Sequence, residues 1–408
     1  MAVKREKSEN DVVIVSALRT PFGRFGGVLK DVPALDLGVA VIKGVLNRIG
    51  RKDVRVDEVI MGNCCQCEVK PLAPVVARAA LLKAGLPPEV VSITLDRACC
   101  SSMAAVQTGR RDIVTENADV VLAAGMENMS RVPYLIRELR WGTRAADVIL
   151  TDDLFGMSPA EGYPPVARDA GEVAMEYGFD RAAMDLWAYN SQMRYQQALK
   201  EGKFEEEIVP FEFVQRKKPV VFEQDEFPKA DTTLEGLAKL PAIYGSPSVS
   251  AGNAPGLDTG ASAILLMRRS SADAYGLEPL ARLLTVQSVA APPRYMATTP
   301  AAAIQKALGK CGLSVDDLNL IEINEAFAAV PMVSCKILAG NDERKTKKLF
   351  EITNVNGGAI AIGHPVGASG ARIILTLMYE LRRRGGGIGA AAICGGLAQG
   401  DAAIIATE

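Results

Sequence analysis

The sequence predicts an α/β fold made of two duplicated halves, each with a mixed and mainly parallel sheet, and one long insertion. Three observations lead to this prediction. Apolar segments of strand length alternate with segments whose apolar residues recur at helical spacing. The 408 residues are 49% hydrophobic and only 23% charged, which is typical of buried helices and parallel strands. Short motifs of the first part also recur in the second.

The elements of the first half follow one another in a regular order. Buried strands are expected at 11–18, 56–63, 89–98 and 118–130 because each is a short apolar run bounded by turn residues. Helices are expected between them, because helical spacing is found at 34–50, 72–87 and 100–115. Glycine and proline residues end the first two of these helices.

The segment 129–249 has a different residue pattern from the rest of the chain. Charged helical stretches such as 183–204 mix there with irregular, proline-rich sequence, which predicts an insertion that covers a site. After it the alternation resumes. Strands are expected at 260–269, 280–290 and 318–323, helices at 299–313 and 367–385, and two strands with a glycine turn at 387–408.

Two motif pairs indicate an internal duplication. The stretch "RACCSSMAA" is echoed by "GHPVGASGARI", and "VVLAAGMEN" is echoed by "AAAICGGLA". We therefore expect a first half at 1–128 with 250–272, an inserted domain at 129–249, and a second half at 273–408. Two sheets back to back would bury the alanine-rich helices from both sides.

Cys99 stands where a strand ends and a helix is expected to begin. The first N–H groups of a helix carry partial positive charge, so a thiol there is expected to lose its proton more easily. The thiolate is the nucleophilic form. The alternative is that Cys99 and Cys100 are ordinary buried small residues.

His364 is the single histidine of the chain, so any imidazole chemistry must use it. It lies in "NGGAIAIGHPVGASG", where the glycines indicate a close approach of backbone to another group. It also precedes a helix of small residues, as Cys99 does. If the halves pack as symmetric copies, Cys99 and His364 meet as nucleophile and base.

Two further motifs end strands. Cys394 is either a core residue or a second thiol that acts as acid and base, and Gly395 and Gly396 offer N–H groups suited to an oxyanion hole. Asn324 and Glu325 follow the apolar run "LNLIEI". Either the two residues form an ordinary turn, or the Asn324 side-chain amide orients a water or the histidine.

Composition argues against several function classes. A net charge of −2 predicts no general attraction to nucleic acid or to acidic membranes. With no secretory or membrane-spanning apolar stretch, the expected location is the cytoplasm, with reduced cysteines. The stretch "GNCCQCE" holds Cys64, Cys65 and Cys67, but no second cysteine pair or nearby histidine completes a metal site, so none is expected.

Taken together, the motifs resemble those of the thiolase family over nearly the whole chain. The "Cys-x-Ser" around the nucleophile, "NEAFA", "GGAIAIGHPVGASG" and a final "Cys-x-Gly" occur in the family's order. "RTPFGRFGG" and "SAGNAPGLDTGAS" resemble it as well. The resemblance implies a layered α-β-α-β-α fold and an acyltransferase that uses coenzyme A as co-substrate, with no permanently bound cofactor.

The resemblance also implies a mechanism. Cys99, activated by His364, would attack the 3-keto carbon of a 3-oxoacyl-CoA, and Cys394 would protonate the departing enolate. CoA would then remove the acyl group, and the reverse reaction would be a Claisen condensation. A water held by Asn324, together with His364 itself, would form one oxyanion hole, and the N–H groups of Cys99 and Gly396 the other.

Residues toward CoA and the assembly follow from the same resemblance. The contacts with CoA are expected at Lys229, Ser250, Ala251, Ala326 and Phe327. The family suggests a homodimer or homotetramer. Cys100 is interpreted as a packing residue, although a shift of one position in the alignment would make it the nucleophile.

The sequence departs from the family pattern at several positions. Ser102 replaces a frequent glycine, Asp96 an asparagine and Pro255 a serine, the last motif reads "CGGLAQG", and "GYPPVARDAGEVA" lacks a common histidine. We therefore expect retained catalysis with an acyl specificity other than simple acetoacetyl-CoA.

Two alternatives remain at this point. A condensing enzyme acting on carrier-protein thioesters shares the ancestral fold, but the single histidine and Cys394 favour a thiolase. A non-catalytic thiolase-like subunit or a thiol sensor would explain the surplus cysteines.

Overall fold

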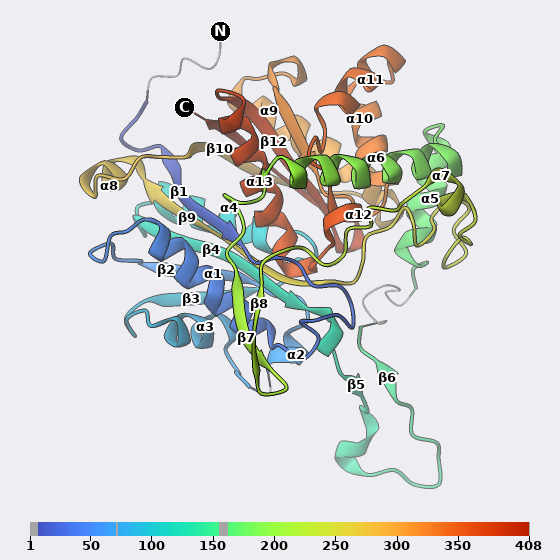
Figure 1. Cartoon of the computed structure of the whole chain (residues 1–408), viewed down its shortest axis with the longest axis horizontal. Helices are drawn as coiled ribbons and strands as arrows, with labels where there is room; N and C mark the ends of the chain where they lie inside the picture. Colours follow the sequence, from blue (N-terminus) through green and yellow to red (C-terminus); the bar gives the residue numbers. More distant parts are fainter. Residues whose placement is uncertain (1–6, 71, 155–161, 408) are drawn as a thin grey trace.

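The computed structural model describes residues 7–70, 72–154 and 162–407. Nine strands form one sheet in the order β11-β12-β13-β10-β1-β9-β4-β2-β3 (Figure 1). Their bounds are β1 Val12–Arg19, β2 Glu58–Gly62, β3 Val91–Leu95, β4 Val120–Asn128, β9 Thr259–Arg268, β10 Ala281–Ala290, β11 Leu320–Ile323, β12 Gly387–Gly395 and β13 Gln399–Thr407.

The strand order repeats itself in the two halves. From the centre outward the first half runs β1-β9-β4-β2-β3 and the second runs β10-β13-β12-β11. The halves meet where β1 and β10 pair antiparallel. Beside β11 a single bridge joins Ile321 to Thr353, at the place that β3 takes in the first half. The topology therefore contains the duplication that the motifs indicated.

The sheet is mixed, and its parallel pairs lie toward its two edges. They are β2 with β3, β2 with β4, and β11 with β12, whereas the five central pairings are antiparallel. Helical crossovers join β2 to β3 and β3 to β4, which parallel strands require. In the second half a short turn joins β12 to β13, and the equivalent place between β4 and β9 holds the long insertion.

Helices cover both faces of each half of the sheet. Their bounds are α1 Ala34–Arg48, α2 Gln66–Val69, α3 Val76–Ala84, α4 Ser101–Val114, α8 Arg269–Ala274, α9 Thr299–Cys311, α10 Ala329–Leu338, α11 Glu343–Ile352, α12 Ala359–Ile362 and α13 Ser369–Arg383. Nothing in the sequence analysis foresaw α10 and α11.

The layers are visible in the alternation of core residues along each strand. In β1, Val13 and Val15 share a core with α1 and α3, while Val12 and Ile14 share a core with α4 and α13. In β13, Ala402 and Ile404 belong to the core formed with α9 and α10. The two buried helices α4 and α13 thus lie between the halves of the sheet, in helix–sheet–helix–sheet–helix order (Figure 1).

The insertion between β4 and β9 contributes helices, a hairpin and an arm. Its described elements are β5 Tyr134–Leu135, β6 Thr151–Asp152, α5 Val166–Glu176, α6 Arg181–Lys200, β7 Phe211–Gln215, β8 Lys218–Phe222 and α7 Leu234–Ala238. A buried guanidinium fixes it to β1, because Arg19 donates to Glu207 at 2.7 Å and to Asp225 at 2.6 and 2.9 Å. Removing one partner of such a buried group would cost about 3–5 kcal/mol.

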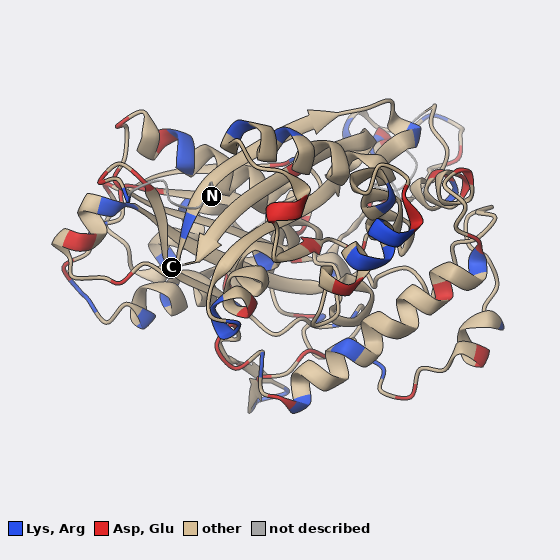
Figure 2. Cartoon of the chain, turned by 90° about the horizontal axis from the view of Figure 1, so that it is seen from above, with Lys and Arg blue, Asp and Glu red and all other residues tan. Residues whose placement is uncertain are grey.

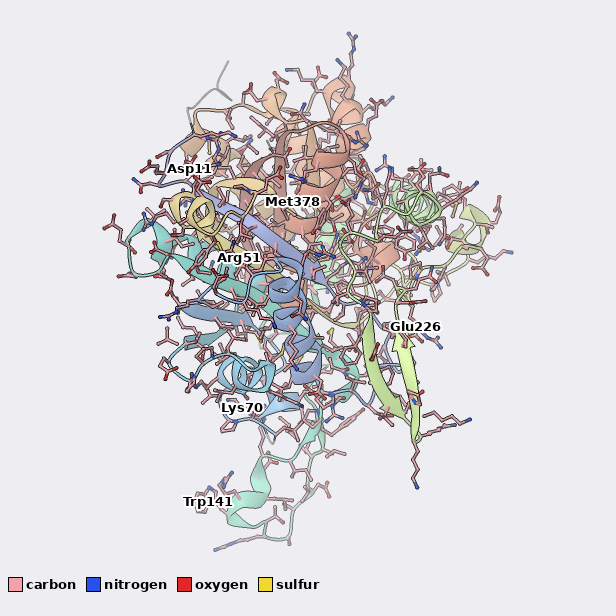
Figure 3. The ribbon with its side chains drawn as sticks, turned by 60° about the vertical axis from the view of Figure 1, so that its left-hand side comes forward. Asp11, Arg51, Lys70, Trp141, Glu226 and Met378 are labelled. Carbon is pink, nitrogen blue, oxygen red and sulfur yellow. The ribbon has the colours of Figure 1, made fainter. Side chains whose placement is uncertain are left out.

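The arm with β5 and β6 projects away from the body of the protein (Figure 1). Trp141, at its far end, is 90% exposed (Figure 3). Charged residues gather on peripheral helices and loops, and the strands across the middle are largely uncharged (Figure 2). None of the described helices combines the length and apolar character needed to cross a membrane.

Candidate active site

A strained turn holds Cys99 between β3 and α4. Ala98 has a φ of 45°, in the left-handed region that costs a non-glycine residue about 1 kcal/mol or more. The Asp96 side chain stabilises this turn by accepting from the Ala98 N–H at 2.8 Å. Cys99 itself stays partly exposed, whereas Cys100 is fully buried. The turn thus presents one of the two adjacent thiols.

The imidazole of His364 faces the Cys99 thiol. The His364 Nε2 atom lies 3.2 Å from the Cys99 Sγ atom, and Nδ1 lies 2.6 Å from the Ser369 hydroxyl. Ser369 donates its own hydroxyl proton to the Pro365 carbonyl at 2.9 Å. Since that hydroxyl has only one proton, Nδ1 must be the donor toward Ser369. Nε2 then carries the lone pair and accepts from the thiol.

Two buried carboxylates hold the His364 loop. Asp258, just before β9, accepts from the His364 N–H at 2.7 Å. Glu127, at the end of β4, accepts from the Gly367 N–H at 2.9 Å and from the N–H groups of Cys64 and Cys65. The His364 loop is therefore tied to the first half of the molecule, where Cys99 resides.

The loop after Cys394 packs directly on the Cys99 turn. A Cβ on Gly396 would lie 3.0 Å from the Cβ of Ala98, and one on Gly395 would lie 2.8 Å from the Cys100 Sγ. Glycine is therefore needed for this contact. Burial raises the pKa of the Cys394 thiol, and the nearby Cys99 adds to the shift. Leu397, in the place of a further glycine, has a φ of 53°.

Asn324 and Glu325 have different surroundings. Asn324 is buried at the end of β11, and its Nδ2 has no hydrogen-bond partner among the described residues. Glu325 accepts from Trp187, Ser191, Asn354 and the Ile360 N–H at 2.8–3.0 Å. Glu325 thus holds α6 against the second half, and the Asn324 Nδ2 donor stays unpaired among the described residues.

Burial keeps the catalytic pair neutral in the resting protein. Burial raises the pKa of the Cys99 thiol to about 12, and burial together with the Arg372 charge lowers the pKa of His364 to about 3. The expectation of an acidified Cys99 is therefore wrong. The helix begins two residues later, at Ser101, and loss of hydration outweighs its dipole. A nucleophilic Cys99 would therefore have to transfer its proton to His364 as it reacts.

Acidification is expected to destabilise the protein through His364. The imidazole titrates near 6.5 when hydrated but at about 3 in the fold, so between these values only the unfolded chain binds the proton. The free energy of unfolding then falls as pH falls from 6.5, by up to about 1.4 kcal/mol per pH unit. Thermal unfolding of wild type and His364→Asn between pH 7 and 5 checks this. Parallel Tm curves for the two proteins would contradict it.

A cavity of about 170 Å³ lies at the insertion, next to the second half. It contains two of the residues expected to contact CoA, Lys229 and Ala251. The other three, Ser250, Ala326 and Phe327, are buried and do not line it. The remaining lining residues are ordinary polar and apolar types from the insertion and both halves, so no sequence motif marked them: Gln192, Phe227, Asp231, Thr232, Thr233, Gly236, Leu237, Leu240, Gly252, Ala254 and Ile360.

The other cysteines have structural surroundings. Cys64 contacts the Ala98 carbonyl at 3.1 Å and the Ser101 hydroxyl at 3.3 Å, so it supports the Cys99 turn. Within the described residues the eight cysteines form no disulfide, and no group of three or more His, Cys, Asp or Glu side chains is arranged to hold a metal ion.

Two of the departures from the family pattern are also structural. The Ser102 hydroxyl accepts from the Ala371 N–H at 2.9 Å and so joins α4 to α13. Asp96 stabilises the Cys99 turn, as described above. These two residues therefore support the Cys99 turn and the contact between the two buried helices.

Comparisons with known proteins agree with this geometry. Residues 12–270 match the family profile "Thiolase, N-terminal domain", and residues 277–407 match "Thiolase, C-terminal domain". The acetyl-CoA acetyltransferase of Escherichia coli (strain K12) is 44% identical over 400 residues, which are 96% of this chain and 98% of that protein.

Solved structures give the same result. The human mitochondrial 3-ketoacyl-CoA thiolase superposes with a TM-score of 0.92 at 37% identity, over 98% of this chain and 100% of that one. A structure of the human enzyme in complex with CoA gives a TM-score of 0.91 at 37% identity, over 98% of both chains. The chain belongs to the thiolase family and is an acyltransferase of that family.

Proposed function

We propose that this thiolase cleaves a 3-oxoacyl-CoA with CoA, or runs the reverse condensation, through an acyl group carried on Cys99. The observation that supports this most directly is the 3.2 Å approach of the His364 Nε2 to the Cys99 Sγ, with the hydrogen-bond chain through Ser369 leaving Nε2 unprotonated. This is the arrangement that a nucleophile and its general base require.

The reaction begins with the neutral pair. His364 takes the thiol proton as the Cys99 sulfur attacks the 3-keto carbon of the substrate. The bond between C2 and C3 then breaks, and its electron pair passes to C2 as the enolate of the departing acyl-CoA. Cys394 gives its proton to C2, and the proton on His364 restores the Cys394 thiol. Burial raises the pKa of Cys394, so its thiolate is basic enough to act in the reverse direction.

In the second half-reaction, the acyl group leaves Cys99. The CoA thiol attacks the thioester, its proton passes to His364, and His364 returns a proton to the Cys99 sulfur. An oxyanion forms in each half-reaction. A water held by the Asn324 Nδ2, together with the protonated His364, would serve one, and the N–H groups of Cys99 and Gly396 the other. Each lost donor would cost on the order of 3 kcal/mol.

CoA is proposed to bind in the cavity that contains Lys229 and Ala251. The Lys229 ammonium lies 5.5 Å from the centre of the Phe227 ring, and both residues line the cavity. A cation beside an aromatic ring suits a phosphorylated nucleotide.

Reversing the charge of Lys229 is expected to weaken CoA binding. Lys229→Glu should raise the KM for CoA by about 10- to 100-fold, with kcat nearly unchanged, because one charge-assisted phosphate contact is worth about 1.5–3 kcal/mol. Lys239→Glu is the matched control, since Lys239 is exposed and lies outside the cavity. Equal KM values for both variants would place the nucleotide elsewhere.

The proposed assembly is a homodimer or homotetramer in the cytoplasm. The edge strand β3 exposes Val91 and Ile93, and the arm exposes Trp141 and Ile149. Unpaired edges and apolar projections of this kind call for a covering surface. Light scattering should show a dimer or tetramer for wild type and a lower state for Ile93→Glu. A monomeric wild type would contradict this prediction.

Thiolysis across a panel of 3-oxoacyl-CoA chain lengths tests the proposed function and the expected acyl specificity together. Activity with any of them supports a thiolase, and a clear preference for acetoacetyl-CoA would defeat the expectation of a different specificity. Involvement in β-oxidation requires activity on longer chains. An inactive but folded protein with an unreactive Cys99 would favour the thiolase-like subunit.

A further inference from the structure

Arg372 is a buried cation that the proposed mechanism does not yet use. It lies in the first turns of α13 with none of its side chain exposed. Its Nη1 is 3.4 Å from the Glu322 Oε2, and its Nη2 is 3.4 Å from the Asn324 Oδ1. Glu322 and Asn324 are two residues apart, so they face α13 from the same side of β11 and its extension.

The contact with Arg372 decides which way the Asn324 amide points. The oxygen and nitrogen of an amide have nearly the same shape, so only its neighbours fix its orientation. A guanidinium has donors and no acceptor, so the atom that it faces must be Oδ1. The Nδ2 group is therefore turned away from Arg372, and it is buried without a partner among the described residues.

The duplicated half provides an internal comparison. Asn63 follows β2 as Asn324 follows β11. The Asn63 Nδ2 donates to Glu127 at 2.9 Å and to the Met126 carbonyl at 3.2 Å, and it is its Oδ1 that lacks a partner among the described residues. The helix of that half, α4, has Ala104 three residues after its first residue, where α13 has Arg372. In the second half, which has Arg372, the unpaired group of the asparagine is the donor Nδ2. In the first half, which has Ala104, the unpaired group of the asparagine is the acceptor Oδ1.

We propose that Arg372 is a positioning residue that holds the Asn324 amide with its donor toward the water that serves the reacting carbonyl oxygen, and that Glu322 accepts from the other side of the guanidinium. The inference rests on the proposed role of Asn324 in an oxyanion hole. This role explains why a guanidinium is buried in α13, the helix that follows the His364 loop. Without Arg372 the amide is free to turn its oxygen toward that water. The water would then donate a proton to the amide oxygen, and it would lose the donor that polarises it toward the developing negative charge.

A double-mutant cycle tests this, with thiolysis kinetics of wild type, Asn324→Ala, Arg372→Met and the double variant. We expect Asn324→Ala to lower kcat about 100-fold and Arg372→Met about 10-fold or more, with little change in the KM for CoA. Removing Arg372 from Asn324→Ala should then cost less than about twofold, because the amide is already gone. Arg372→Lys, which keeps a donor, should recover part of the activity.

Controls separate positioning from folding. Glu322→Leu with Arg372→Met removes the buried pair together and leaves no unpaired carboxylate, so it provides a folded variant if Arg372→Met alone does not fold. Arg282→Met, at the partly buried ion pair that Arg282 of β10 forms with Asp11, should lower Tm without lowering kcat. Equal losses from Arg372→Met with and without Asn324 would overturn the proposal. Full activity of Asn324→Ala would instead show that the assigned role of Asn324 is wrong, and Arg372 would lose its role with it.

Discussion

Cys99→Ala is expected to abolish thiolysis, with a loss on the order of 10⁴-fold or more. The structure offers His364 one thiol at 3.2 Å, and removal of that sulfur leaves no atom to carry the acyl group. Thermal stability should stay close to that of wild type, because Cys99 is partly exposed. Steady-state thiolysis of a 3-oxoacyl-CoA and a thermal melt measure the two effects.

Cys100→Ala is the matched control for this variant. Cys100 is adjacent in sequence and fully buried, with its thiol directed to the Ile393 carbonyl at 3.6 Å. The Cys100→Ala protein should keep most of the wild-type activity and should have a somewhat lower thermal stability. Iodoacetamide should label Cys99 in wild type, and acyl-CoA should protect it. Loss of activity in Cys100→Ala with retention in Cys99→Ala would reverse the assignment of the nucleophile.

Cys394→Ala is expected to separate the two halves of the reaction. Carbon–carbon cleavage needs an acid for the enolate, so thiolysis should fall about 10³-fold. Exchange of an acyl group between acyl-CoA and labelled CoA uses only Cys99 and His364, so it should persist at a rate within about tenfold of wild type. Both rates are measured on one preparation, which makes each the control for the other.

Two results would contradict this division of roles. Loss of both activities in a folded Cys394→Ala protein would mean that Cys394 supports the Cys99 loop, which the contact between Gly396 and Ala98 makes conceivable. Retention of both would mean that Cys394 is only a core residue. Cys335→Ala controls for loss of a buried thiol, because Cys335 lies in the core on α10, where its thiol contacts Thr353.

The sequence predicted much of the fold because its pattern is local. Apolar runs and glycine stops placed β1, α1, β4 and α13 to within a few residues. The repeated motifs indicated the duplication, which the strand order shows. Prediction failed at α10 and α11, whose pattern was not recognised, and at the direction of the central strands, since a strand's apolar pattern does not reveal the direction of its neighbour.

For the candidate site, too, some features could be predicted from the sequence and others could not. Residue type and motif alone pointed to Cys99, His364, Cys394 and Asn324 as candidates for the chemistry, and their roles stay a prediction. Only the tertiary structure decided their state. The pKa of a thiol depends on the hydration that it loses, and burial raised that of Cys99 where the helix start predicted a decrease. Likewise the orientation of the Asn324 amide depends on Arg372, a residue 48 positions away that the sequence analysis did not single out.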